Sequence, residues 1–306
     1  MSTSPHTCGF VSLIGAPNVG KTTLLNALVG RKVGIVSDTP QTTRNRITGI
    51  STTTDSQIIF IDHPGFHKPR FRLNREMMKL TMSGLKGVDV ILFVLDARYG
   101  AGPLDQELIR PLAGGSRPVM ALLNKIDLVP HKPDLIPRMA ALHTKLPEAD
   151  IYPVSARTGE GLPEVASALA ARMPEGPPLF PEDQWTTQGE NFFVAELVRE
   201  KVLASCRDEL SYAVAVEIVQ TQEDEAKNLL SVHARLICEK DGQKAILIGK
   251  GGAMVRDIGT AARREIEDLL GVHLFLDLQV KVIPGWRNNP AVLRQLTPSG
   301  SDDLES

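Results

Sequence analysis

The run Gly15-Ala-Pro-Asn-Val-Gly-Lys21-Thr22 constrains this chain more than any other feature, because it fits the phosphate-binding pattern G-x-x-x-x-G-K-[ST] in full. An apolar run, 10–14, precedes it, and a helical pattern begins at Thr23. Glycines let backbone N–H groups approach phosphate oxygens, and the N-terminus of a helix adds positive potential. The sequence therefore predicts a strand, a phosphate-binding loop and a helix, with Lys21 at the β- and γ-phosphates and Thr22 as a Mg²⁺ ligand.

Composition leaves the function to local motifs. The chain has 306 residues, enough for two domains, and its formal net charge is −2, so any RNA-binding surface must be a local patch. Cys8, Cys206 and Cys238 have no metal-ligand spacing, which favours reduced thiols. Residues 1–7 lack a secretory pattern, and the longest apolar run, 88–97, is too short to cross a bilayer. We therefore expect a cytoplasmic protein.

The first part of the chain alternates strand-like and helix-like segments, which is typical of a mostly parallel sheet covered by helices. The segments at 47–53 and 57–61 lie too close together for a crossover helix, so we expect an antiparallel hairpin there. The expected strands besides 47–53 are 10–14, 57–61, 90–95, 119–123 and 151–154. The sequence predicts an α/β domain over residues 1–175.

A proline-rich stretch after Met173 cannot continue a helix and predicts a linker over residues 176–190. A different pattern follows, and it predicts a smaller α+β domain over 191–296 and a flexible polar tail over 297–306. The expected helices are 192–205 and 253–270, the expected strands are 212–221, 230–239 and 272–283, and a hairpin turn is expected at Asp241-Gly242 before a short apolar segment, 245–248.

Polar motifs follow three of the expected strands. Asp62 ends one strand and can hold Mg²⁺ through water, and Gly65 allows a backbone N–H to approach a γ-phosphate. The run Asn124-Lys125-Ile-Asp127 follows another strand, and its aspartate can accept both N–H donors of a guanine edge while the lysine stem lies over the base. The backbone N–H groups of Ser155-Ala156 could meet the guanine carbonyl. Ligands bind at such strand ends in open α/β sheets.

A nucleotide switch also needs a hydroxyl between the phosphate loop and Asp62, where it senses Mg²⁺ and the γ-phosphate. The run Asp38-Thr-Pro-Gln-Thr42-Thr43-Arg44 offers two candidates. Either threonine could serve, and Thr43 is preferred. The plainer interpretation is that both are ordinary loop hydroxyls.

The set of motifs resembles the translation-factor class of small GTPases, and most closely the Era family, whose members assist maturation of the small ribosomal subunit. The resemblance covers roughly residues 9–290. It rests on Gly15 to Thr22, Pro40-Gln-Thr-Thr-Arg44, Asp62 to Gly65, Asn124 to Asp127, Ser155-Ala-Arg157 and a C-terminal RNA-binding pattern. It implies a P-loop GTPase domain, GTP and GDP as ligands, hydrolysis by water attack, Mg²⁺ dependence and a conformational switch.

The resemblance also implies roles for individual residues. The catalytic set is Lys21, Thr43 and Gly65, and the metal set is Thr22, Thr43 and Asp62. The expected nucleotide contacts are Gly15, Pro17, Asn18, Val19, Gly20, Lys21, Thr22, Thr23, Asp62, Gly65, Asn124, Lys125, Asp127, Ser155 and Ala156.

Three positions bear on how water would be activated. His63 stands where the Era-like pattern has Thr; it could position water, or it could simply point away. Phe66 occupies the position at which Ras-type enzymes carry a water-orienting glutamine, so hydrolysis must be slow or assisted from elsewhere. Asn18 could help to hold a monovalent cation, K⁺, as in similar GTPases, or it could brace the loop.

The run Gly249-Lys250-Gly251-Gly252 before a helix matches the G-x-x-G loop of KH domains, which clamps four single-stranded nucleotides. Its surroundings resemble the type II KH arrangement. Lys250 could contact a phosphate, and Arg256 and Arg263, seven residues apart, share a helix face that could bind RNA or remain solvated. Trp286 could stack on RNA or pack in the core, and Arg287 could pair with RNA.

The sequence therefore predicts an Era-like GTP hydrolase that binds small-subunit rRNA near its 3′ end and assists assembly of the 30S subunit. The expected partners are GTP, this rRNA and the 30S subunit, with peripheral contact to the inner membrane as a further expectation and no DNA. The alternatives are a GTP-regulated binder of another structured RNA or of the membrane surface, and an RNA-binding module with a purely structural nucleotide site.

Overall fold

The computed structural model describes residues 6–37, 39, 42–67, 71–206 and 209–296. It divides the chain into two units. The first comprises Met1–Arg70 and Asn74–Thr187, and the second comprises Phe71–Leu73 and Gln188–Ser306. The tail predicted at 297–306 lies outside the described residues.

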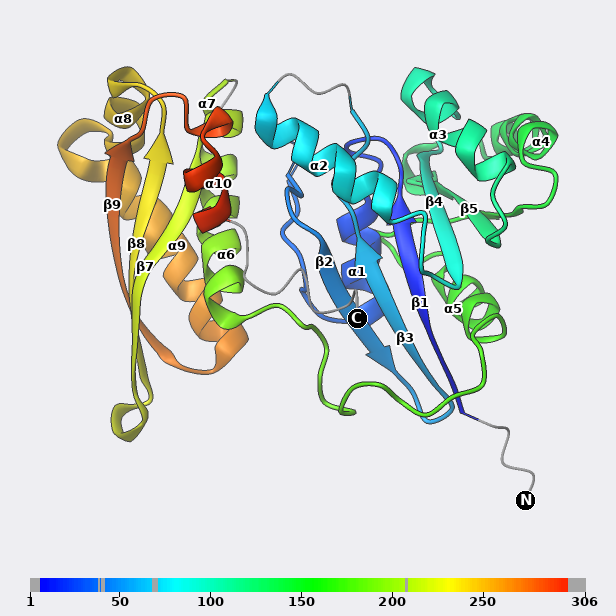
Figure 1. Cartoon of the computed structure of the whole chain (residues 1–306), viewed down its shortest axis with the longest axis horizontal. Helices are drawn as coiled ribbons and strands as arrows, with labels where there is room; N and C mark the ends of the chain where they lie inside the picture. The colour runs from blue at the N-terminus through cyan, green and yellow to red at the C-terminus, as the bar shows by residue number, and fades with distance from the viewer. Residues whose placement is uncertain (1–5, 38, 40–41, 68–70, 207–208, 297–306) are drawn as a thin grey trace. The chain divides into compact units, whose positions relative to one another are not determined.

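The first unit is built on a six-stranded sheet in the order β2-β3-β1-β4-β5-β6 (Figure 1). All neighbouring strands are parallel except β2 and β3, which pair antiparallel, as the short spacing between them predicts. The strands are β1 (Thr7–Ile14), β2 (Ile47–Thr52), β3 (Ser56–Asp62), β4 (Val90–Asp96), β5 (Val119–Asn124) and β6 (Asp150–Pro153). The predicted mostly parallel sheet is confirmed.

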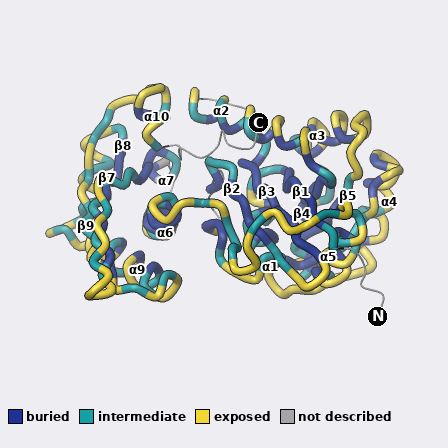
Figure 2. The backbone as a smooth tube through the Cα atoms, turned by 60° about the horizontal axis from the view of Figure 1, so that its bottom comes forward, coloured by how far each residue is buried: buried dark blue, intermediate teal, exposed yellow. Residues whose placement is uncertain are grey.

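Helices cover both faces of this sheet. All seven residues of β4 are buried, as expected for a parallel strand between two helical layers. On one face, Leu108 and Leu142 join Phe93 in a single apolar core. Figure 2 shows the strands of this sheet largely in the colour of buried residues. On the other face α1 packs so closely that a Cβ on Gly49 of β2 would lie 2.7 Å from Leu25. The helices are α1 (Lys21–Val29), α2 (Arg72–Ser83), α3 (Pro103–Ala113), α4 (Leu135–Lys145) and α5 (Leu162–Ala170).

The proline-rich stretch is fixed along the edge of the first unit, so it is not an extended free linker. The Gln57 side chain donates to the carbonyl oxygen of Phe180 at 2.8 Å and accepts from the backbone N–H of Leu179 at 2.8 Å. The backbone N–H of Ile50 donates to the carbonyl oxygen of Trp185 at 2.9 Å. These contacts explain why the structure divides the chain after Thr187 and not at 175.

The second unit has a three-stranded sheet in the order β7-β8-β9, with β8 antiparallel to β7 and parallel to β9. Helices α6 and α9 pack on each other and on this sheet (Figure 1). Helix α9 begins and ends beside left-handed glycines and buries Ile258, Ala262 and Ile266, four residues apart. The elements are α6 (Glu190–Ser205), α7 (Glu209–Ala213), β7 (Ala215–Asp224), β8 (Leu229–Cys238), α8 (Asp241–Ile248), α9 (Ala253–Leu270), β9 (His273–Val282) and α10 (Pro290–Leu296).

Two sequence expectations for the second unit are wrong. Asp241-Gly242 does not form a hairpin turn but starts helix α8, because the Gln243 side chain accepts hydrogen bonds from the backbone N–H groups of Glu239 and Lys240. The strand expected from residue 212 begins at Ala215, since α7 occupies the positions before it. Among the described helices, none is long and apolar enough to span a membrane.

Candidate nucleotide site and RNA-binding loop

The carboxyl ends of parallel strands bring the predicted motifs to one edge of the first unit's sheet. Gly15 follows β1, Asp62 ends β3 and Asn124 ends β5. The Asn124 amide donates to the carbonyl oxygen of Val19 at 2.8 Å, and this bond ties the end of β5 to the phosphate loop. The motifs, separated in sequence, therefore form one site.

Close approach of backbone segments explains two glycines of this site. Gly20 has a left-handed φ of 95°, and a Cβ there would lie 2.4 Å from the Asn124 amide nitrogen. A Cβ on Gly65 would lie 2.7 Å from the Cα of Pro17. Asn124 can lie close to position 20, and Pro17 can lie close to position 65, only because both positions lack side chains.

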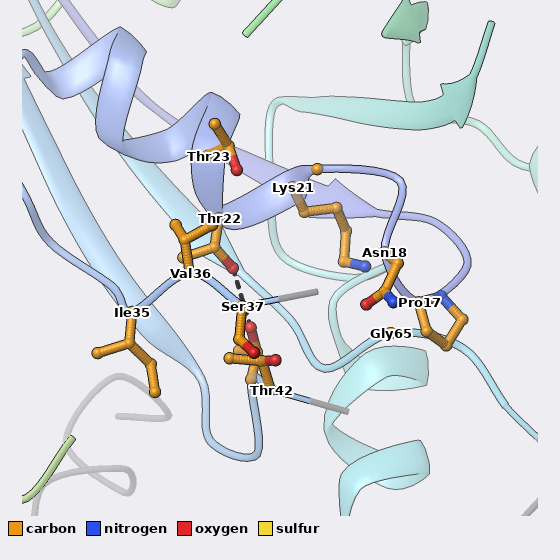
Figure 3. A pocket seen from close by; sticks show the side chains of 12 residues that line it. Pro17, Asn18, Lys21, Thr22, Thr23, Ile35, Val36, Ser37, Thr42 and Gly65 are labelled. Carbon is orange, nitrogen blue, oxygen red and sulfur yellow. Dashed lines mark hydrogen bonds between the residues drawn. The ribbon is translucent and has the colours of Figure 1, made fainter. Parts of the chain in front are cut away.

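Lys21 is folded into the phosphate loop. Its side chain is 6% exposed, and its ammonium donates to the carbonyl oxygens of Gly15 at 3.2 Å and Ala16 at 3.0 Å. Burial lowers the pKa of Lys21. Figure 3 shows the side chain extending along the loop into the pocket. The ammonium therefore lies where the loop would enclose phosphate oxygens.

Three oxygen-bearing side chains meet beside the loop. The Thr22 hydroxyl donates to Asp62 Oδ2 at 2.6 Å and lies 2.9 Å from the Thr43 hydroxyl. Asp62 is fully buried, and its Oδ1 has no hydrogen-bond partner among the described residues. Burial raises the pKa of Asp62 to about 6, against the attraction of Lys21. One oxygen of this buried carboxylate is therefore left without a hydrogen bond from the described residues, beside two hydroxyls.

The structure distinguishes the two threonines that the sequence left open. The Thr42 hydroxyl donates to the carbonyl oxygen of Thr39 at 2.6 Å, whereas the Thr43 hydroxyl faces Thr22. Both threonines line the same pocket. The contact of the Thr43 hydroxyl with Thr22 supports Thr43 as the residue nearest the candidate metal position. The pocket is lined by Pro17, Asn18, Gly20, Lys21, Thr22, Thr23, Ile35, Val36, Ser37, Thr42, Thr43 and Gly65.

The candidate base subsite lies at the ends of β5 and β6. Asp127 accepts a hydrogen bond from the Ser155 hydroxyl at 2.7 Å and forms an ion pair with Arg157 at 2.6 Å. Burial alone would raise the pKa of Asp127, but Ser155 and Arg157 outweigh it and hold the pKa below its ordinary value. The exposed Arg157 therefore occupies one side of the carboxylate that is expected to receive guanine.

The backbone N–H groups expected to meet a guanine carbonyl are bonded within the protein. The N–H of Ala156 donates to Asn124 Oδ1 at 2.9 Å, and the N–H of Ser155 donates to the carbonyl oxygen of Glu160 at 2.9 Å. A base that used these donors would have to share or exchange both bonds. The geometry therefore does not support the expectation that these two N–H groups are available to the guanine carbonyl oxygen.

The structure favours the plainer interpretation of His63. The ring is 2% exposed and packs against Gly84, where a Cβ would lie 2.3 Å from Nε2. Burial lowers the pKa of His63 to about 3, so the ring is neutral near pH 7. Phe66 packs against the apolar core of the first unit, as expected for a side chain that does not orient water.

Asn18 has a left-handed φ of 62° and lines the pocket, and its carbonyl oxygen accepts a hydrogen bond from the Lys125 ammonium. This bond shows the bracing role for its backbone. The contact of the Asn18 side chain with a monovalent cation stays a prediction.

The G-x-x-G run of the second unit forms a tight turn between α8 and α9. Gly249, Gly251 and Gly252 all have positive φ, at 72°, 60° and 79°. A Cβ on Gly249 would lie 2.8 Å from the backbone nitrogen of Met254, whereas Gly251 faces open space. Lys250 is exposed, so the turn presents backbone and one cation to solvent.

Arg256 and Arg263 are exposed on α9, as their spacing predicts. Trp286, by contrast, belongs to the core: it is 1% exposed, and its indole N–H donates to the carbonyl oxygen of Ala213 at 2.9 Å. Arg287 pairs with Glu239 and lies over the Phe71 ring, 3.9 Å from its centroid. Of the two alternatives for Trp286, the structure therefore supports packing in the core.

Sequence reasoning missed two charged groups at the base subsite. Asp96 ends β4 and lies 3.0 Å from the Lys125 ammonium, and Arg157 pairs with Asp127. The position of Asp96 at the end of a buried apolar run was a usable signal, because Asp62 and Asn124 stand at strand ends in the same way. Arg157 belongs to the run Ser155-Ala-Arg157, but nothing in that run indicates its ion pair with Asp127.

Comparisons with known proteins agree with this arrangement. Residues 10–125 match a family described as 50S ribosome-binding GTPase, and residues 209–287 match the KH domain. GTPase Era of Geobacter metallireducens is 45% identical and covers 97% of this chain and 99% of the relative; GTPase Era of Lacticaseibacillus paracasei is 46% identical, with 96% and 97% covered.

Two solved structures are similar over most of the chain. A point variant of Aquifex aeolicus Era bound to GDP and AlF₄⁻ is 38% identical with a TM-score of 0.91. Era in complex with MgGDPNP and nucleotides 1506–1542 of 16S ribosomal RNA is also 38% identical, with a TM-score of 0.92. Each structure covers 95% of this chain and is itself 98% covered. With the phosphate loop, the Asp62 cluster and the KH turn all in place, this chain belongs to the Era family of GTPases.

Proposed function

We propose that this GTPase hydrolyses GTP at the pocket around Lys21 and uses its KH unit to bind small-subunit rRNA near the 3′ end during 30S assembly. The observation that carries the nucleotide part is the cluster of Thr22, Thr43 and Asp62 beside a buried loop lysine. The RNA part rests on the exposed G-x-x-G turn and on the similar Era structure that contains 16S rRNA.

Hydrolysis depends on placing positive charge where negative charge develops on the transferred phosphoryl group. The Lys21 ammonium is hydrogen-bonded to two carbonyl oxygens of the loop. It can exchange these bonds for contacts with the β- and γ-phosphates. Gly65 lies against the loop and can offer its backbone N–H to the γ-phosphate. Phe66 is apolar and packs against the core, and His63 is buried, so we expect neither side chain to orient the attacking water.

The donor set at Asp62 fits Mg²⁺. Two hydroxyls and a buried carboxylate with one unpartnered oxygen are hard ligands, which this ion prefers. Bound Mg²⁺ neutralises charge on the β- and γ-phosphates. Thr22 and Thr43 would contact it directly, and Asp62 would act through water. Asn18 would hold K⁺ as a further cation, and equal hydrolysis rates in K⁺ and Na⁺ would remove that role.

Guanine recognition rests on Asp127, whose carboxylate would accept the two N–H donors of the base. Ser155 orients this carboxylate through a 2.7 Å hydrogen bond. Lys125 adopts a left-handed backbone conformation that carries its side chain back across the phosphate loop, where the stem would cover the base. Entry of a nucleotide would move the exposed Arg157 aside at little cost, since exposed ion pairs contribute little.

A cytoplasmic location and a peripheral pool at the inner membrane remain predictions of the sequence. The three cysteines are free and buried, which agrees with a reducing compartment. Sedimentation of the protein with anionic vesicles would test the membrane contact.

Single-turnover hydrolysis with and without an RNA of the 16S 3′ end tests the proposed function. We expect Lys21→Ala to abolish hydrolysis, Lys86→Ala at an exposed site of the same unit to preserve it, and RNA affinity to differ between GTP-bound and GDP-bound protein. RNA affinity independent of nucleotide would contradict the coupling and favour an RNA-binding module with a structural nucleotide site. Crosslinking in cells followed by sequencing of the bound RNA would identify another RNA target if there is one.

A further inference from the structure

Asp96 joins the base subsite to the turn after β4. It is 9% exposed and pairs in register with Asn124 of the neighbouring strand β5. Its Oδ2 lies 3.0 Å from the Lys125 ammonium and 2.7 Å from the Arg98 guanidinium. One nearly buried carboxylate therefore holds two cations at the edge where guanine is expected.

The path of Lys125 shows what this carboxylate does. Its ammonium also donates to the carbonyl oxygen of Asn18, and its Cε passes 3.8 Å from where a Cβ on Gly20 would lie. The side chain therefore lies across the phosphate loop, with its charged end at Asp96. A lysine side chain has many rotamers, so an anchored end fixes where its apolar stem lies.

We propose that Asp96 is a positioning residue of the guanine subsite and acts by holding the ammonium of Lys125, so that the lysine stem is preordered to cover the base. This inference rests on the proposed role of Lys125 in guanine binding. Asp96 itself would contact neither the base nor the phosphates.

Charge agrees with this geometry. Burial alone would raise the pKa of Asp96, but hydrogen bonds from Arg98 and Lys125 outweigh it and hold the pKa below its ordinary value. Asp96 is thus an anion at neutral pH. The plainer role is that of a turn residue, because its Oδ1 accepts from the backbone N–H of Arg98 at 3.0 Å.

The substitution Asp96→Asn separates the two roles. Asparagine keeps an oxygen that can accept the Arg98 N–H, so the turn is preserved, but it removes the charge that holds Lys125. Arg98→Ala is the matched control, because it removes the other cation of the same carboxylate and leaves the Lys125 contact in place.

The experiment measures the Kd of a fluorescent GDP for the full chain carrying Asp96→Asn, Lys125→Ala, both, or Arg98→Ala. We expect Asp96→Asn to raise the Kd roughly three- to tenfold, Lys125→Ala to raise it more, and the double variant to match Lys125→Ala, because coupled residues are not additive. Arg98→Ala should stay within about twofold. Any loss in turnover should appear as a higher KM for GTP, because the stem of Lys125 would cover the base equally in the ground state and in the transition state.

Two results would overturn the inference while leaving the guanine site intact. In the first, Asp96→Asn weakens GDP binding as much in the Lys125→Ala background as in the wild type. In the second, Arg98→Ala weakens GDP binding as much as Asp96→Asn does. Lys125→Ala with unchanged GDP affinity would instead remove the proposed role of Lys125, and the inference with it. Thermal unfolding of each nucleotide-free variant shows whether any loss comes from misfolding.

Discussion

Gly84 lies directly against the His63 ring, so closely that a Cβ on the glycine would come within 2.3 Å of Nε2. The ring is buried, and it cannot turn into solvent to make room. The two residues therefore form a size-matched pair at the end of α2. A histidine at position 63 requires the smallest residue at position 84.

We expect Gly84→Ala to lower the free energy of unfolding by about 1–3 kcal/mol, the usual effect of overpacking. The same change in a His63→Thr background should cost less, because the shorter side chain leaves space for the methyl group. Urea unfolding of the two single variants and the double variant measures this coupling. Gly114→Ala is the matched control, since a Cβ there meets nothing closer than 3.8 Å. Additive losses would show that the two side chains do not share this space.

Asp62 gives the nucleotide-free protein a specific pH dependence. Its pKa is raised from 3.8 to about 6 in the folded state, so the folded state binds this proton more tightly than the unfolded state. The stabilisation from Asp62 is complete below about pH 4 and is lost as the pH rises through 6. The free energy of unfolding should fall over this range by on the order of 1–3 kcal/mol from this group.

Asp62→Asn should remove that contribution. The unfolding free energy of the wild type, measured in EDTA without nucleotide, should therefore fall relative to that of the variant as the pH rises from 4 to 7. The low pKa of His63, about 3, acts in the opposite direction below pH 6.5, but both proteins carry that histidine and it cancels in the difference. Parallel stability curves would mean that the Asp62 carboxyl is not preferentially protonated in the folded protein.

Asp127 should set the preference for guanine. In Asp127→Asn an amide donor replaces one acceptor, and xanthine presents an acceptor where guanine presents a donor. We expect GTP binding to weaken by about 2–5 kcal/mol, as for a truncated buried charged pair, and XTP binding to improve. Competition of both nucleotides against fluorescent GDP measures the two affinities.

Arg157→Ala is the informative control for this experiment. It removes the cation beside Asp127 but keeps the carboxylate, and Arg157 is 71% exposed. GTP affinity should therefore stay within about threefold of the wild type. An Asp127→Asn protein that kept full GTP affinity without gaining XTP affinity would contradict the assignment of the base subsite.

The sequence was most informative where function and strand ends coincide. The phosphate loop, Asp62 and Asn124 were all predictable, because parallel strands end at one edge of a sheet and these motifs each follow an apolar run. Spacing alone could not show which of two neighbouring threonines faces the candidate metal position. Only the fold of the loop turns Thr42 toward its own backbone and Thr43 toward Thr22.

The failures come from side chains whose partners lie outside the local pattern. Asp241-Gly242 reads as a turn, but Gln243 caps a helix there through backbone N–H groups before it. The sequence left Trp286 open between stacking on RNA and packing in the core, because its hydrogen-bond partner, Ala213, lies 73 residues away. Asp96 stands at the end of an apolar run, but its contact with Lys125 could not be predicted, because the two residues become neighbours only in the folded sheet.

The G-x-x-G turn should contact RNA at a site that is separate from the nucleotide pocket. Gly251 has a φ of 60° and faces open space, so Gly251→Asp adds a carboxylate without a clash, and aspartate tolerates this backbone conformation better than most residues. Gly249 is a poor position for the test, because a Cβ there would meet the Met254 backbone.

We expect the double variant Lys250→Asp with Gly251→Asp to lose binding of a single-stranded 16S 3′-end fragment while it keeps wild-type GDP affinity and thermal stability. Lys227→Glu is the control for charge, since Lys227 lies at the tip of the β7–β8 hairpin, and α8 and the turn follow the opposite end of β8. Wild-type affinity should decrease with salt at a log–log slope of about −0.7 for each phosphate contact, and the double variant should show a shallower slope. A folded double variant with wild-type RNA affinity would remove the KH turn from the RNA-binding surface, and the proposed contact with small-subunit rRNA would then have to lie on another part of the chain.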